Sequence, residues 1–365
     1  MWFDKDDINI SRSITIEDIH GYVLPHAGTK HTGHILSHTL RFKPKKNFSK
    51  VIILFYPSFP KPNVNGKYYH EYYVPWKTLD YVFKDHWNIK NIQFVGYNLK
   101  QISVNLSYLN LDNTLIIVSA DFSHYIPLDE AIEKENKAAH SLMFNNFTKS
   151  DYINVVDDVK SFKQLYHITK RKNWTLQWIG RTRSEGLNAV GYLSFLIREN
   201  ANPKKDLPDG MFVTVYDKKM NTRECLGEWF DSSPWNTTVE KNLINKVIRK
   251  GRSPSRLSPH LNENKLPKNK IIPLTNYTIT YLYKDKKPFI RGWHGVQHEA
   301  FFLPDVFLEN TYNNGKWIDS YDKVWGIGNR FYMRETLNRL RQKANSNING
   351  KNYNLFSSKV SHVKL

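Results

Sequence analysis

The stretch from Leu115 to Tyr125, LIIVSADFSHY, constrains the fold of this chain more than any other. It opens with four consecutive apolar residues, which is typical of a short strand buried on both faces of a parallel sheet. Asp121 and His124 follow in the next loop. Open α/β sheets bind their ligands just past the carboxyl ends of such strands. The sequence therefore predicts an α/β sheet with a polar site at the end of this strand.

Two interpretations of Asp121 and His124 are open from the residues alone. Because they lie three positions apart, a tight turn could point both side chains into one pocket. In the alternative, Asp121 caps the next segment and His124 is a hydrogen-bonded turn residue. The first interpretation predicts a functional site and the second a structural turn.

The remaining pattern of the first 200 residues favours the same α/β class. Apolar runs that alternate with helical segments predict a sheet with crossover helices. The predicted strands cover residues 22–24, 51–56, 91–97 and 115–118. An apolar stripe at helical spacing predicts a helix over 128–144. Residues 57–76, with several prolines and an Asn-Gly pair, are expected to form a long loop.

The length of 365 residues suggests two domains. An α/β domain is expected over residues 1–200, a linker rich in Pro and Lys over 201–209, and an α+β domain over 210–345. Within the second domain, strands are predicted at 211–216 and 275–283, and a last basic helix at 333–344. A helix is predicted from the capping-box residue Thr237 through Arg249. The polar tail, 346–365, is expected to be disordered.

Charge and cysteine content bear on partners and compartment. Lys and Arg number 53 against 34 acidic residues, a net charge of +19, and most of the excess follows residue 203. Such a balance favours acidic partners, so nucleic acid is a candidate partner of the basic half. Cys225 is the sole cysteine, so no intramolecular disulfide can form. With no apolar signal core and no membrane-length apolar run, we expect a cytoplasmic protein that is not in a membrane.

Several motifs in residues 20–197 resemble the Memo family. Pro25-His-Ala-Gly28 is followed by Thr32-Gly33, and Ser119-Ala-Asp-Phe-Ser-His-Tyr125 matches the family's Ser-x-Asp-Phe-x-His-aromatic motif. Pro57-Ser58 matches the start of Gly-Pro-Ser-His-His, and Tyr72 with Pro75 fits a later Tyr-x-x-Pro. The resemblance implies a fold like the class III extradiol dioxygenases. It also implies a metal, iron or copper, held by two histidines and a third ligand.

The resemblance places His26 at the first ligand position, His124 at an acid/base or outer position, and Asp121 as the partner of His124. Phe59 stands where the family has a ligating histidine, and Val190 where it has a cysteine. Neither side chain can ligate a metal, so the sequence predicts a degenerate site without tight transition-metal binding. A metal-free binding pocket, a site rewired from His26 and His124 with His31 and Asp121, and a purely structural domain are the alternatives.

Residues 207–345 resemble the AMMECR family, which implies an α+β fold. The matching segments are Gly210-Met-Phe-Val-Thr-Val215, Arg223-Glu-Cys-Leu-Gly227, Gly292-Trp-His-Gly295 and Phe302-Leu-Pro-Asp-Val306. They point to Cys225, Arg223 and His294 as further candidate site residues. Cys225 is either buried apolar filler or a nucleophile aided by the adjacent Arg223. The family's Asp-x-Arg-Phe motif keeps its arginine here as Arg256 but lacks the acid.

Three functions follow as hypotheses. Memo and AMMECR proteins recur together with a radical-SAM protein, so such a protein is an expected partner. The first hypothesis is a fusion protein that binds or helps to modify a macromolecule without a working metal site. The second is a metal-dependent oxidoreductase that uses His26, Asp121 and His124. The third is a nucleic-acid-associated module, carried by the basic half.

Overall fold

The structure is a computed structural model. It describes residues 1–10, 13–102, 105–144, 155–184, 186, 189–218, 222–230, 234–253, 271–283, 291–295, 300–302, 312–313, 316–317 and 353–365. The chain divides into two compact units, the first formed by Met1–Glu199 with Asp305–Arg339 and the second by Asn200–Pro304 with Leu340–Leu365. The helix expected at 333–344 and Arg256 lie outside the described residues.

The first unit is built on a mixed six-stranded sheet with the order β5-β4-β6-β2-β8-β7. Its strands are β2 (Ile19–Leu24), β4 (Lys50–Phe55), β5 (Gln93–Asn98), β6 (Thr114–Ser119), β7 (Trp174–Arg183) and β8 (Gly191–Glu199). The first four run parallel to one another, and β8 pairs antiparallel with both β2 and β7. All six residues of β6 are buried. The four strands predicted from apolar runs are confirmed.

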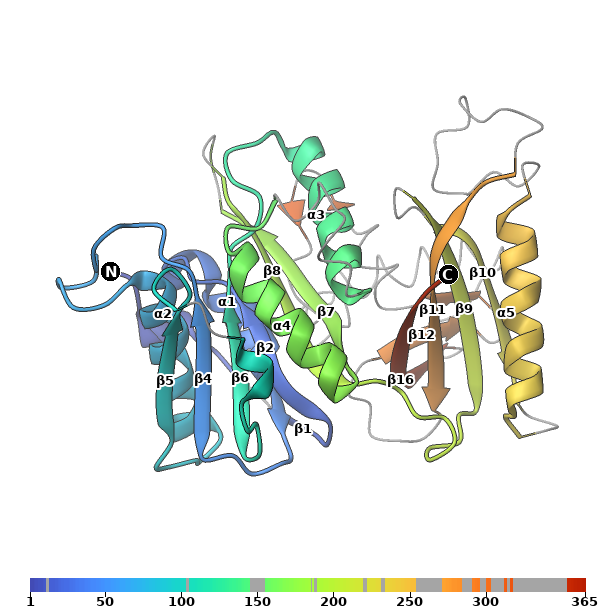
Figure 1. Cartoon of the computed structure of the whole chain (residues 1–365), viewed down its shortest axis with the longest axis horizontal. Helices are drawn as coiled ribbons and strands as arrows, with labels where there is room; N and C mark the ends of the chain where they lie inside the picture. Colours follow the sequence, from blue (N-terminus) through green and yellow to red (C-terminus); the bar gives the residue numbers. More distant parts are fainter. Residues whose placement is uncertain are drawn as a thin grey trace. The chain divides into compact units, whose positions relative to one another are not determined.

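Helices cover both faces of this sheet. They are α1 (Thr29–Leu40), α2 (His70–Tyr81), α3 (Leu128–Met143) and α4 (Val159–Lys172). The first unit also contains three short helical turns, η1 (Lys5–Asp7), η2 (Val82–His86) and η3 (Leu106–Tyr108). Its two-stranded ribbons pair β1 (Ile14–Ile16) with β3 (Phe42–Pro44) and β14 (Tyr312–Asn313) with β15 (Lys316–Trp317). In Figure 1, α4 lies in front of the sheet, where it packs against β6 and β7. In the described part of the chain, no helix is both long and apolar enough to span a bilayer.

The order of the strands predicts a crevice at the carboxyl end of β6. The chain leaves β4 toward β5 at one edge of the sheet, whereas it leaves β6 toward β7 at the other edge. Connections that diverge from neighbouring parallel strands open a crevice at their carboxyl ends, and ligands bind there. The loops after β2, β4 and β6 therefore meet at one place.

The segment 57–76 is not a loop throughout, because α2 begins at His70. Pro75 lies inside this helix and has no N–H to bond the carbonyl of Glu71. The Glu71 carbonyl instead accepts the hydroxyl of Ser119, 2.5 Å away at the end of β6. The proline that favoured a loop is thus tolerated, because the tertiary structure supplies the missing donor.

In its described residues, the second unit is an antiparallel sheet with the order β10-β9-β11-β16-β12-β13 and one packed helix. Its elements are β9 (Gly210–Asp217), β10 (Thr222–Trp229), α5 (Thr237–Gly251), β11 (Leu274–Tyr283), β12 (Arg291–Gly295), β13 (Ala300–Phe302) and β16 (Tyr353–Lys364). Inward residues of β9 and β11, among them Val213 and Ile279, form a core with Leu243 and Val247 of α5. This arrangement is α+β, with the predicted strands and helix in place. The segment expected to be a linker contacts this unit through Ala201, which packs on the same core.

The disordered tail expected over 346–365 is wrong for residues 353–364. They form β16, which lies inside the sheet and pairs antiparallel with β11 on one side and β12 on the other. The segment is polar, yet the backbone ladder requires no apolar side chains on an exposed face. Polar composition therefore misled the sequence-based expectation.

Deleting residues 353–365 should unfold the second unit, because it removes an interior strand and leaves two unpaired strand edges. Limited proteolysis should then cleave the second unit rapidly while fragments of residues 1–199 persist. Removing Leu365 alone, which follows the strand, is the matched control and should leave the resistance unchanged. A truncated chain as resistant as the full chain would show that β16 is dispensable.

The helix α5 is capped one residue earlier than the capping box predicts. Asn236 is the N-cap, and its side chain accepts the amides of Thr238 and Val239 at 3.0 Å each. Glu240, the other member of the expected box, accepts instead from the Trp235 ring N–H and the Tyr281 hydroxyl at 2.9 Å each. The carboxylate thus ties the helix to β11 rather than to its own first turn.

Asn236→Ala should lower the free energy of unfolding by about 1 kcal/mol, because two amides lose their acceptor. Thr237→Ala, at the position that a capping box would use, should change it far less. Urea unfolding of the two variants and of the natural chain measures the difference. Equal losses in both variants would restore the capping-box interpretation.

Candidate functional site

Buried polar residues gather at the carboxyl end of β6, where the loops after β2, β4 and β6 meet. His26 follows β2, Asp121 follows β6, and His70 and Glu71 open α2 after β4. Asp157, just before α4, joins them. The expectation of a polar site past the central buried strand thus corresponds to a real cluster.

His26 is enclosed by acidic and hydroxyl groups and is 2% exposed. Its Nε2 lies 3.0 Å from Oδ2 of Asp157 and 3.7 Å from Oδ2 of Asp121. Its backbone N–H donates to Oδ1 of Asp121 at 2.9 Å, and its Nδ1 lies 3.0 Å from the Ser119 hydroxyl. Asp121 therefore binds the loop after β2 rather than capping the segment that follows it.

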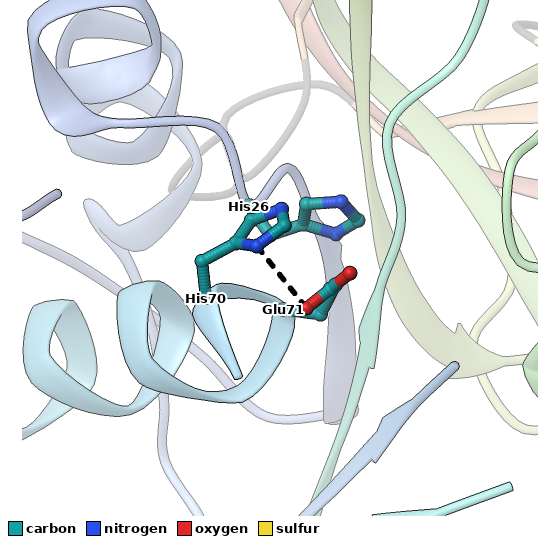
Figure 2. Close-up of side chains that lie close together, drawn as sticks. All are labelled: His26, His70 and Glu71. Atoms are coloured by element: carbon teal, nitrogen blue, oxygen red, sulfur yellow. Dashed lines mark ion pairs between the residues drawn. The ribbon is translucent and has the colours of Figure 1, made fainter. Parts of the chain in front are cut away.

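His70 and Glu71 face His26 from the first turn of α2 (Figure 2). The rings of His26 and His70 lie 5.2 Å apart, and Nδ1 of His70 lies 3.3 Å from Oε2 of Glu71. The side-chain amide of Asn63 donates to that same Nδ1 at 2.8 Å. Glu71 is fully buried, and its Oε1 accepts the amide of Ser58 at 2.7 Å. Among the described residues, its Oε2 has no hydrogen-bond partner.

The hydroxyl of Ser119 fixes which nitrogen of His26 is available. It donates its one proton to the Glu71 carbonyl, so it can only accept from Nδ1 of His26. Nδ1 therefore carries a hydrogen, and Nε2 is the nitrogen that can exchange a proton for another cation. Metal-binding histidines are oriented by this kind of hydrogen bond on the opposite nitrogen.

The two imidazoles carry different charges. Burial alone would lower the pKa of His26, but Asp121, Asp157 and Glu71 together outweigh burial and raise it to about 10. Burial and the neighbouring charge of His26 lower the pKa of His70 to about 4. At neutral pH the site therefore pairs an imidazolium with a neutral imidazole. Burial also raises the pKa of Asp121.

Two overlapping groups in the site have the spacing of metal ligands. His26, His70 and Glu71 form one, and His26, Asp121 and Asp157 form the other; in each, one ligand atom per residue lies within 4.8 Å of the others. Two imidazoles with one carboxylate are typical of non-haem iron(II) sites and also suit zinc, whereas copper(I) prefers thiolate or thioether ligands. The donor chemistry therefore fits iron(II), one of the metals that the Memo resemblance implies, and does not favour copper(I).

A cavity of about 160 Å³ adjoins the cluster. His124, Lys134 and Asp157 lie in its wall, so His124 shares a cavity with the acid that binds His26. The His124 backbone forms a β-bridge with Val190, which brings these two sequence-derived positions side by side. His124 is thus connected to His26 through Asp157 rather than by direct contact.

The segment that carries His124 is anchored by the buried carboxylate of Glu135 on α3. Glu135 accepts the hydroxyl of Ser123 and lies 3.5 Å from Arg181. A Cβ on Gly191 would lie only 1.8 Å from Oε1 of Glu135, so the close approach of β8 requires glycine there. The wall of the cavity is therefore held by a charged network behind it.

The sequence offers His26 as the one imidazole ligand, and the structure places a second imidazole, that of His70, beside it. Phe59, at the expected histidine position, is 50% exposed, and its ring centroid lies 5.9 Å from that of His70. An imidazole, that of His70, therefore lies next to the position where Phe59 has none. His31 is exposed on α1 and belongs to neither ligand group, so the rewiring through His31 is wrong.

Sequence reasoning missed His70, Glu71 and Asp157. Residues 57–76 were expected to be a loop, which hid the start of α2. The available signal was an adjacent histidine and glutamate at the start of a helical pattern over 70–81. Asp157 had no signal of its own, because its partner His26 is far away in the sequence.

Cys225 and Arg223 lie in the second unit on β10. Cys225 is exposed and accepts the Thr214 hydroxyl at 3.2 Å, so it is not buried filler. Arg223 is buried beside Gly251 of α5, because a bulge at this point breaks the alternation of β10. The guanidinium and the thiol therefore face opposite sides of the sheet, and Arg223 is not placed to activate the thiol. His294 lies on β12, and its side chain is outside the described residues.

A scan against models of protein families finds no match, and neither does a comparison with curated proteins. Any functional assignment therefore starts from the geometry of the candidate site.

His26 in the metal-free protein should keep both ring protons at pH 8, whereas His70 should be neutral. Because the folded pKa of His26 exceeds its ordinary value of about 6.5, its stabilisation is present below that value and is lost as pH rises toward 10. Nitrogen-15 shifts of the imidazoles across a pH titration measure this. Asp157→Asn should lower the pKa of His26, and a neutral His26 at pH 8 in the natural chain would contradict the geometry.

Proposed function

We propose that this chain binds one divalent metal ion through His26, His70 and Glu71 and acts as a metal-dependent oxidoreductase of the two-histidine, one-carboxylate type. The observation that carries the proposal is the buried Oε2 of Glu71, which lies 3.3 Å from Nδ1 of His70 yet accepts no hydrogen bond within the described residues. A buried carboxylate oxygen that accepts no hydrogen bond is costly, and a metal ion would satisfy it.

The charge balance supports the same proposal. Glu71, Asp121 and Asp157 surround a single imidazolium, that of His26. An excess of buried carboxylates is unfavourable unless a cation compensates it. Replacing the Nε2 proton of His26 by a divalent ion would supply that compensation at the centre of the cluster.

Each remaining residue has a role in this proposal. Ser119 orients His26, and Asn63 holds the ring of His70. His124 and Lys134, in the wall of the adjoining cavity, would face a substrate, where His124 can donate or accept a proton. An iron(II) ion held by His26, His70 and Glu71 would supply oxygen chemistry.

We also propose that the two units are Memo-like, with a class III extradiol dioxygenase-like fold, and AMMECR-like. The support is positional. The motifs at 25–28 and 119–125 both follow strands of one sheet and contribute His26 and Asp121 to one cluster. The departure from the Memo pattern at Phe59 is offset by His70, so the expected loss of tight metal binding gives way to the proposal of a rebuilt site.

Anaerobic titration with iron(II) should show one tight site per chain. His70→Ala should weaken binding by at least about tenfold, because it removes a proposed ligand. The matched control is His31→Ala, which removes an exposed histidine of α1 and should leave affinity unchanged. Affinity should rise between pH 7 and pH 9, because the metal displaces the proton of His26.

Metal analysis after dialysis supplies the decisive comparison. A natural chain that retains no iron, zinc or manganese above the His70→Ala variant would overturn the proposal. The metal-free binding pocket would then be the better description of the site.

A further inference from the structure

A second cavity in the first unit, about 380 Å³ in volume, lies between the segment after β5 and one face of α4. Its polar lining consists mainly of cations and amides. Lys100, Gln101, Lys160, Lys163, Gln164 and His167 contribute to it. None of the described residues that line it is Asp or Glu.

Two of the three lysines lie over one aromatic ring. Nζ of Lys160 lies 4.9 Å and Nζ of Lys100 5.9 Å from the centroid of Tyr56. Tyr56 directly follows β4, so the ring gathers two ammonium groups from separate elements at the carboxyl edge of the sheet. Cation–π contacts are worth only about 0.5–1 kcal/mol at exposed sites, so they do not offset the charges fully.

No described carboxylate pairs with the lysines of this cavity. Within the described part of the chain, neither Lys100, Lys160 nor Lys163 forms an ion pair. Lys160 and Lys163 lie three residues apart in the first turns of α4, so they share a face of the helix. The positive end of the helix dipole adds to their potential.

We propose that this cavity binds the diphosphate or triphosphate group of a small molecule. Lysine ammonium groups and side-chain amides are donors that suit phosphate oxygens. The volume exceeds what a single phosphate requires and lies in the range of small-ligand pockets, about 300–1,000 Å³. The location also fits, since ligands of α/β sheets bind beyond the carboxyl ends of the strands.

This site is independent of the proposed metal site, because the two share no lining residue or ligand. It also differs from the nucleic-acid hypothesis, which rests on charge that follows residue 203. Pyrophosphate is the simplest probe of the proposed chemistry. Citrate tests whether any small polyanion binds the cavity. A single-stranded oligonucleotide tests whether the cavity binds nucleic acid instead.

Isothermal titration of the full chain with pyrophosphate, in metal-free buffer at low salt, should show one site. Lys160→Gln combined with Lys163→Gln should weaken binding by at least about tenfold, and Lys100→Gln, on another element, should weaken it too. The matched control is Lys170→Gln, an exposed lysine of the same helix outside the cavity. Circular dichroism establishes that each variant is folded.

Three results would overturn the proposal: no pyrophosphate binding, equal binding by the double variant and the Lys170→Gln control, or binding of the oligonucleotide or citrate in preference to pyrophosphate. The His70→Ala variant should bind pyrophosphate as the natural chain does. Failure of the anion site and failure of the metal site are therefore distinguished by separate variants.

Discussion

The hydroxyl of Ser119 is the contact on which the candidate site depends. It donates to the carbonyl that Pro75 leaves free on Glu71 and accepts from His26, so one side chain at the end of β6 joins the loop after β2 to the helix after β4. Without this link, the Glu71 carbonyl would be buried without a donor, and the ring of His26 would lose the contact that fixes its orientation. The two hydrogen bonds of Ser119 thus help to fix the position of the His26 ring relative to the helix that carries His70.

Charge decides what the site can hold. The protonated His26 compensates part of the buried negative charge, and its raised pKa measures how strongly the surrounding carboxylates favour a cation at that point. A proton and a metal ion compete for the same nitrogen, so the protonated cluster and the proposed metal centre are two states of one electrostatic arrangement. His70, held neutral by burial and by the charge of His26, is ready to ligate without losing a proton from an imidazolium.

The two units differ in how their sheets are completed. In the first, parallel strands require helical crossovers, and the loops of these crossovers build both the acidic cluster and the lysine-lined cavity at one edge of the sheet. In the second, β16, which follows the other strands in sequence, inserts into the antiparallel sheet between β11 and β12. Its one thiol, Cys225, lies exposed on β10, away from the face where Arg223 is buried.

The sequence by itself determined the elements whose signal is local. Apolar runs located β2, β4 and β6, and the residues just past β6 were predicted to form a site because α/β sheets bind ligands beyond the carboxyl ends of buried parallel strands. The tertiary structure alone decided which side chains complete that site. His26, Glu71, Ser119 and Asp157 lie far apart along the chain and meet because of the strand order, which no local pattern encodes. The same holds for β16, whose polar residues are ordered by backbone pairing to β11 and β12, since hydrogen bonds between strands do not depend on the side chains that a sequence displays.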